Sequence, residues 1–435
     1  MNAHPRNLGR AQIYWGAVAE PASAGADLGT HVEIQETTGA LHEVPLTARH
    51  FQIFPRILRR YTPAHLWYLA RQPRRRRRLL REVQQLGERW RKANVEKNDA
   101  GSVLVAGPLS DTNGLGRASR YELDRIISSY QTVQTVDVRR ETAESIKRQI
   151  QSGRLAKPDI LIVLSQPDNY KLIFPLFERE FLARAWRIGL LVWEMPYCPR
   201  EWQPASNLLH EIWAPSRFAA EPLSQGLGLP FEVRPHPVDM PDVLPMDRAR
   251  FGLAKDAFLG IAVMDLRVCP DRKNPLAHIE AWQRAFGRDG RYQLLLKARF
   301  QRRTEIIRTE LREMIAGYKN ITLVDETFTD LEMVQFQRMA DVYFSLHRSE
   351  GFGLNIKEML ELGTPVVATN WSAPAEYMSA YANAFSVNST MVPYFDFTRS
   401  YAHQGPLFWA EPDIHHAAHI LKEVAARRSS PPAAS

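Results

Sequence analysis

Short apolar runs alternate with helix-like segments along most of the chain, and this alternation constrains the fold more than any other feature. Runs of four to six residues separated by helical segments are typical of a parallel β-sheet covered by helices. We therefore predict one doubly wound α/β domain over residues 99–244. Its expected strands are Val103–Ala106, Val133–Val138, Ile160–Leu164, Gly189–Trp193, Glu211–Ala214 and Glu232–His236.

The alternation restarts after a proline-spaced stretch, Pro237–Pro245, which is predicted to be a hinge. We expect a second domain of the same kind over residues 245–411, then a helix over 412–428 and a disordered tail over 429–435. Ligands of such sheets lie beyond the carboxyl ends of the strands, so two facing domains predict one cleft between them. The expected strands of the second domain are Leu259–Met264, Gln293–Lys297, Ile321–Val324, Val342–Leu346 and Val366–Thr369.

Two bulk features bear on the cellular compartment. No apolar run reaches the roughly 18 to 20 residues of a spanning helix, and the first ten residues do not resemble a signal peptide. Cys198 and Cys269 stand alone, without the spacing of a zinc site or a disulfide framework. We expect a cytoplasmic protein, either soluble or peripheral on the inner face of the cell membrane.

Residues 1–98 lack the alternation and are predicted to be a basic N-terminal extension, with a hairpin at His31–Ile34 and His42–Leu46. Residues 51–98 carry 14 Arg and Lys against three Glu, and Arg74–Arg78 are five consecutive arginines. Such a block can contact an anionic membrane, nucleic acid or an anionic glycan, or it can be a solvated helix face. Flanking apolar and aromatic residues favour a helix lying on a membrane.

The most informative string runs from His347 to Thr369 and carries Glu350 and Glu358. A strand, a glycine turn and a helix in this order aim backbone amides at an anion such as a diphosphate. Glu350 falls in the turn and Glu358 about one turn into the helix. Taken alone, Glu350 would only favour the helix dipole and Glu358 would be solvated, whereas together they bracket a ligand.

This string resembles the retaining glycosyltransferases of GT-B fold in which two glutamates are separated by seven residues, the family 4-like enzymes of bacterial surface polysaccharide synthesis. The resemblance spans about residues 102–425. It implies that Glu350 contacts the donor sugar and acts in catalysis, and that Glu358 holds the ribose. It also implies that the turn residues Gly351, Phe352, Gly353 and Leu354 bind the donor.

A second string, Met264–Pro275, is similar to the phosphate loop of the same family and contains Arg272 and Lys273. Fixed cations stabilise a departing diphosphate in a transferase that uses no metal, because negative charge builds on the leaving oxygen. Taken alone, two adjacent cations in a loop are ordinary surface charges. Val268 stands where this variant of the loop has a serine.

Four further residues are candidates at the cleft. Asn113-Gly-Leu-Gly-Arg117 follows the first strand, where the family's glycine loop approaches the donor phosphates or the acceptor; this implies that Gly116 binds the donor and Arg117 lies on the acceptor side. A GxG string alone is a weak signal. Glu194 ends a predicted strand and is expected to meet an acceptor hydroxyl. Lys297 ends another and is expected to approach the diphosphate.

The expected function is transfer of a hexose, with mannose favoured, from a nucleoside diphosphate sugar to a glycan or lipid-linked acceptor, with retained configuration. No aspartate pair of the DxD type lies near a strand end, so we expect no cofactor and no essential metal. The alternatives are a non-catalytic nucleotide-sugar-binding protein, an epimerase or phosphorylase on a related scaffold, and a nucleic-acid-binding protein recruited by the arginine run. We expect no nucleic acid among the partners.

Overall fold

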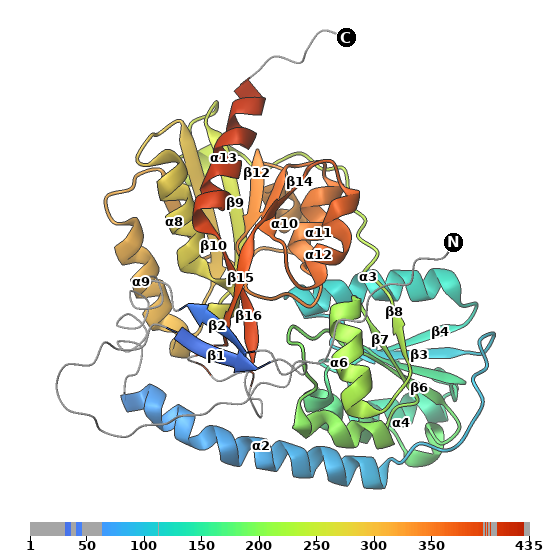
Figure 1. Ribbon diagram of the computed structural model, residues 1–435. Helices are drawn as coiled ribbons and strands as arrows, with labels where there is room; N and C mark the ends of the chain where they lie inside the picture. The colour runs from blue at the N-terminus through green and yellow to red at the C-terminus, as the bar shows by residue number, and fades with distance from the viewer. Residues whose placement is uncertain are drawn as a thin grey trace, which may run out of the picture.

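The structure is a computed structural model that describes residues 31–35, 41–45, 63–111, 113–394, 396, 398, 401 and 407–429. Two α/β lobes make up most of it, each built on a six-stranded sheet (Figure 1). Among the described residues, no helix has both the length and the apolar character that a membrane span requires.

The sheet of the first lobe has the strand order β4-β3-β5-β6-β7-β8, and all neighbouring strands are parallel. β3 and β5 are buried along their whole length, as expected for strands covered on both faces. The strands are β3 (Val103–Gly107), β4 (Val133–Asp137), β5 (Ile160–Val163), β6 (Trp186–Leu190), β7 (Glu211–Ala214) and β8 (Phe231–Val233). The helices between them are α3 (Gly114–Ser129), α4 (Ala143–Gln151), α5 (Tyr170–Ile173) and α6 (Arg217–Leu227).

The sheet of the second lobe has the order β11-β10-β9-β12-β13-β14, again with parallel neighbours. Its strands are β9 (Phe258–Asp265), β10 (Tyr292–Arg299), β11 (Ile321–Val324), β12 (Val342–Ser345), β13 (Val366–Thr369) and β14 (Ala384–Val387). Its helices are α7 (Pro270–Lys273), α8 (Pro275–Phe286), α9 (Glu305–Ile315), α10 (Asp330–Gln337), α11 (Leu354–Glu361) and α12 (Ala373–Tyr377). The predicted pair of doubly wound sheets is therefore confirmed.

Helix α2 (Pro63–Arg89) runs along the lower edge of Figure 1 and joins the first lobe through its carboxyl-terminal half. Val83, Leu86 and Trp90 belong to the apolar core of that lobe. The Arg187 guanidinium, buried on β6, donates to the Trp90 carbonyl at 2.5 Å. The basic segment thus contains an exposed face and a part that the first lobe needs for its packing.

Two antiparallel pairs and one helix complete the described residues. β1 (His31–Gln35) pairs with β2 (Leu41–Pro45), which confirms the predicted hairpin, and β15 (Ser389–Pro393) pairs with β16 (Phe408–Pro412). Helix α13 (Ile414–Ser429) packs on the second lobe beside α8. The rest of the predicted extension, residues 1–30, 36–40 and 46–62, lies outside the described residues, as do residues 430–435 of the predicted tail.

Three strands differ clearly from the sequence prediction. β8 ends at Val233, three residues before the end of the predicted run Glu232–His236, because Pro235 has no backbone N–H to continue the ladder. β6 begins at Trp186, three residues before the predicted run Gly189–Trp193, because Arg187 is buried with its charge satisfied by backbone carbonyls and so hides the start of the strand. β14 was not predicted, since Ala384–Val387 is a short, half-buried edge strand of mixed composition. Its place in the sheet depends on pairing with β13.

Candidate active site

The two sheets open onto one cavity of about 550 Å³ between the lobes. The first lobe contributes the start of α3 and the segments that follow β5 and β6, including Gln166 and Glu194. The second contributes the ends of β9 and β10 and the turn before α11. The cavity therefore lies at the carboxyl ends of the strands of both sheets, where the sequence analysis predicted a cleft between two facing domains.

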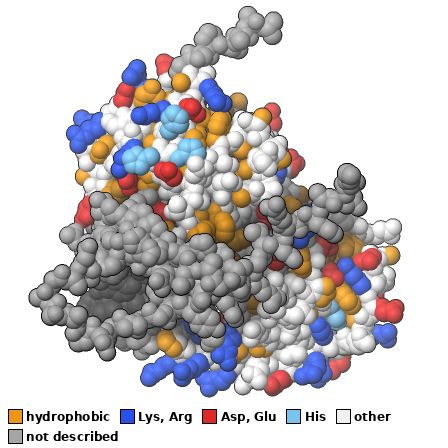
Figure 2. Space-filling view, viewed as in Figure 1, with side chains coloured by type: hydrophobic (Ala, Val, Ile, Leu, Met, Phe, Trp, Pro, Cys, Tyr) orange, Lys and Arg blue, Asp and Glu red, His pale blue; other side chains and the backbone are white. Residues whose placement is uncertain are grey.

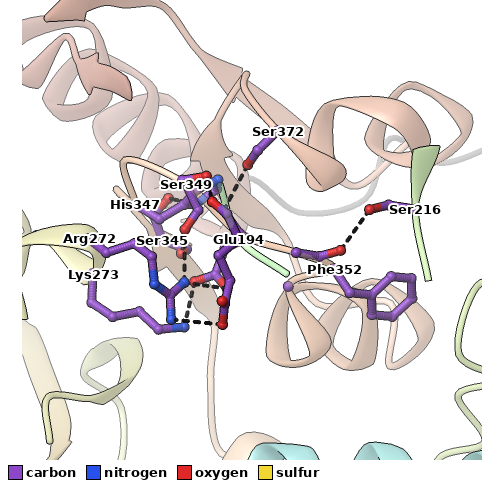
Figure 3. Close-up of polar contacts among 12 residues, drawn as sticks. Glu194, Ser216, Arg272, Lys273, Ser345, His347, Ser349, Phe352 and Ser372 are labelled. Atoms are coloured by element: carbon purple, nitrogen blue, oxygen red, sulfur yellow. Dashed lines mark hydrogen bonds and ion pairs between the residues drawn. The ribbon is translucent and has the colours of Figure 1, made fainter. Parts of the chain in front are cut away.

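Glu350 lies in the turn after β12 and meets two cations from α7. The Lys273 Nζ is 2.5 Å from Glu350 Oε1, and the Arg272 Nη1 is 3.0 Å from Glu350 Oε2. Figure 3 shows the ends of the Arg272 and Lys273 side chains beside each other. Burial would raise the pKa of Glu350, but the charges of Lys273 and Arg272 outweigh burial and lower that pKa to about 2. The three side chains carry a net positive charge in a place shielded from water, which suits an anionic ligand.

Arg272 connects this cluster to the first lobe. Its Nη1 donates to the Ser349 carbonyl at 2.9 Å, and its Nη2 lies 3.5 Å from Glu194 Oε1. The Tyr401 hydroxyl donates to the other oxygen of Glu194 at 3.1 Å. Glu194 therefore reaches the cavity from the first lobe and shares Arg272 with Glu350.

Glycine is required twice in the turn that follows Glu350. A Cβ on Gly351 would lie 2.6 Å from the Trp193 carbonyl oxygen of the first lobe, so the two backbones approach too closely for a side chain. Gly353 has φ +82° and caps the start of α11 in a conformation that other residues adopt at a cost. Phe352 between them is buried, and Leu354 opens the helix at the cavity wall.

Glu358 is fully buried on α11 and faces the first lobe. Arg117 Nη2 lies 2.9 Å from Glu358 Oε2, and Gln337 Nε2 donates to the same oxygen at 2.7 Å. The Tyr121 hydroxyl donates to Glu358 Oε1 at 3.4 Å. Burial raises the pKa of Glu358 despite the opposing charge of Arg117. The structure thus brings Arg117 to the predicted ribose carboxylate, rather than to the Glu194 side of the cavity.

Of the two remaining predicted residues, one lines the cavity and the other does not. Lys297 lines the cavity at the end of β10, donates to the Glu326 carbonyl at 2.8 Å, and has its pKa lowered to about 8 by burial. Gly116 points elsewhere: a Cβ there would lie 2.0 Å from the Asp111 carbonyl oxygen. Gly114, two residues earlier, occupies the cavity wall instead.

Several polar lining residues were not among the predictions. His236 lines the cavity three residues after the end of β8, and Asn355 accepts a hydrogen bond from Arg117 at 3.1 Å. Gln337, buried beside Glu358, comes from the end of α10. The one available signal was position: His236 ended a predicted strand, and Asn355 sits one residue into the predicted helix. No group of His, Cys, Asp or Glu suited to a metal ion occurs among the described residues.

Comparison with known proteins agrees with this geometry. Residues 310–392, from within α9 to within β15, match the model for glycosyl transferases group 1, and this segment contains both glutamates. No curated protein sequence matches the chain.

Two solved structures share the fold. Anabaena HepE in complex with UDP and glucose has a TM-score of 0.50 at 13% identity, covering 66% of this chain and 86% of HepE. The E. coli trehalose-6-phosphate structure bound with UDP-2-fluoro glucose has a TM-score of 0.51 at 12% identity, covering 75% of this chain and 93% of that one. The fold is GT-B, with two facing Rossmann-like lobes. Together with the matched segment, it supports a place in the GT-B glycosyltransferase superfamily.

Proposed function

We propose that this protein is a retaining glycosyltransferase that moves a hexose from a nucleoside diphosphate sugar to a hydroxyl of a glycan or lipid-linked acceptor. The observation that carries the proposal is the cluster of Arg272, Lys273 and Glu350 at the cavity. Its net positive charge and burial suit a leaving diphosphate, and its carboxylate suits the hydroxyls of a sugar. The sequence resemblance favours mannose as the hexose and surface polysaccharide synthesis as the setting.

The proposed reaction needs no nucleophile from the protein. The acceptor oxygen bonds to the anomeric carbon on the face that the leaving diphosphate vacates, and the bond between that carbon and the phosphate oxygen breaks. The acceptor proton passes to an oxygen of the departing diphosphate. Arg272, Lys273 and the amides at the start of α11 stabilise the charge that builds on that oxygen. Retention follows because both bonds lie on one face.

Glu350 would orient the sugar and Glu358 the ribose, with Lys297 near the diphosphate. Glu194, held by Arg272 and Tyr401, would accept a hydrogen bond from the acceptor hydroxyl. We propose no cofactor and no essential metal, since two fixed cations already face the predicted position of the diphosphate.

The first test is binding of UDP, GDP, dTDP and ADP by thermal shift and calorimetry. UDP leads the series because the HepE structure contains UDP and the E. coli structure contains UDP-2-fluoro glucose. A rise in melting temperature with one nucleotide, smaller in Glu358→Ala than in the wild type, would support the proposal. The nucleotide that gives this rise would identify the base of the donor. No response to any of the four would overturn it and favour a nucleic-acid-binding protein, whose binding would weaken steeply with salt.

We also propose that α2 binds the anionic lipid surface at the inner face of the cell membrane. Figure 2 shows Lys and Arg side chains gathered along the edge where α2 lies, and Arg74, Arg75 and Arg77 are exposed. Replacing these three with Gln should reduce flotation with anionic liposomes while leaving flotation with neutral liposomes unchanged. Removing residues 1–98 is a poor test, because Trp90 belongs to the core of the first lobe. Equal flotation of the wild type and the triple variant would contradict this docking.

A further inference from the structure

A histidine on the segment between the lobes forms a buried pair with a glutamate of α3. His236 Nδ1 lies 3.0 Å from Glu122 Oε1, and the side chains are only 1% and 0% exposed. Arg125 Nη2 lies 2.5 Å from the other oxygen of Glu122. A carboxylate held in this way fixes the orientation of the imidazole and assigns Nδ1 to the pair.

The other ring nitrogen of His236, Nε2, takes no part in the pair with Glu122. His236 is one of the lining residues, and its ring packs edge-on against Phe352, with centroids 4.8 Å apart at 75°. Within the described part of the chain, Nε2 has no hydrogen-bond partner, and it is not among the polar atoms buried without one. A histidine kept only for packing would satisfy or bury both nitrogens. The Nε2 of His236 is therefore the ring nitrogen that remains for a ligand in the cavity.

The position of Phe352 indicates which part of a ligand His236 would meet. Phe352 lies in the turn between Glu350 and Glu358. If Glu350 contacts the donor sugar and Glu358 the ribose, as proposed above, the diphosphate joins these two groups and lies against the turn. His236 contacts Phe352 in that turn, whereas Arg272 and Lys273 contact Glu350 before it.

We infer that His236 binds the diphosphate of the donor through Nε2, and that Glu122 is its positioning residue. This inference rests on the proposed function. With Nδ1–H donated to the Glu122 carboxylate, a ring that also carries a proton on Nε2 donates it to a phosphate oxygen. His236 therefore supplies a first-lobe contact to an anion that the second lobe otherwise holds alone.

Two substitutions at His236 separate ligand binding from packing. His236→Asn places an amide nitrogen where Nδ1 was and can keep the bond to Glu122, but it has no atom at the Nε2 position. His236→Gln reaches the Nε2 position and can still donate to a phosphate. Calorimetry with the tightest of the four nucleoside diphosphates, and with its nucleoside, should show about tenfold weaker diphosphate binding in His236→Asn. His236→Gln should retain most of the affinity, and the nucleoside should bind all three proteins alike.

The melting temperature of the ligand-free protein provides the control, and it should change little in His236→Asn. Equal diphosphate affinity in the wild type and His236→Asn would overturn the inference alone. Binding of none of the four diphosphates by the wild type would overturn it together with the proposed function. If His236→Asn does not fold, Glu122→Gln serves instead, because it keeps a hydrogen-bonding side chain; it should weaken diphosphate binding severalfold and spare the nucleoside. Equal weakening of both ligands there would mark the pair as structural.

Discussion

Arg117 of the first lobe and Glu358 of the second form an ion pair between the lobes, with Nη2 2.9 Å from Oε2. The two side chains are only 11% and 1% exposed, so water screens their attraction weakly. Gln337 shares the same carboxylate oxygen. The carboxylate that we assign to the ribose therefore also makes a contact that holds the two lobes together.

The pair should couple the lobes energetically. In a double-mutant cycle with Arg117→Gln and Glu358→Gln, we expect a coupling of about 1–3 kcal/mol in the free energy of unfolding. The exposed pair Arg217–Glu221 on α6 is the control, with an expected coupling below about 0.5 kcal/mol. Denaturant unfolding measures both cycles. Equal couplings in the two would show that burial adds nothing to the Arg117–Glu358 contact.

Glu350→Gln should lower the rate of sugar transfer on the order of 100-fold or more, because it removes the charge that balances Arg272 and Lys273 at the reacting centre. Nucleotide binding should persist, since both cations remain. Glu361→Gln, at the exposed end of α11, is the matched control. Initial rates of sugar transfer, measured with the donor that the binding screen identifies, test this prediction. Comparable rates for both variants would show that Glu350 has no role in the reaction.

Gly351→Ala tests the contact between the lobes at the turn. The new Cβ would lie 2.6 Å from the Trp193 carbonyl oxygen, and backbone cannot move aside as a side chain can. We expect a loss of about 1–3 kcal/mol in stability or a more open arrangement of the lobes. Thermal unfolding and small-angle scattering report these two effects. Gly290→Ala, with nothing within 4 Å of its new Cβ, should leave both unchanged.

The lowered pKa of Lys297 predicts that nucleotide binding depends on pH. Burial lowers its pKa to about 8, so in the free protein it is charged below that pH and loses its proton above it. A diphosphate beside Lys297 favours the charged form, and binding must then restore the proton. Above pH 8 the affinity for the nucleotide should therefore fall by up to about tenfold per pH unit, whereas below pH 8 this group should have no effect.

Calorimetry between pH 7 and 9.5 checks this dependence. In Lys297→Met the affinity should be weaker but flat over the same range, and in Lys319→Met, an exposed site on the same lobe, it should follow the wild type. An unchanged slope in Lys297→Met would show that another group titrates.

The sequence determined the two parallel sheets, because the apolar period and the helix signals that define strands and helices are local. β7, β11 and β13 begin and end where the apolar runs predicted. It also determined the turn that carries Glu350, since Gly353 and α11 follow from residue types within one short string. These features need no knowledge of what lies across the cleft.

Only the tertiary structure decided which side chains from distant segments meet. Arg117, which we expected on the acceptor side, pairs with Glu358. His236 was expected at the end of a strand, but it lies beyond β8 and pairs with Glu122. Gly116 is required by the Asp111 carbonyl rather than by the cavity. Such contacts depend on the angle at which the two lobes and their helices pack. Local sequence patterns do not encode that angle.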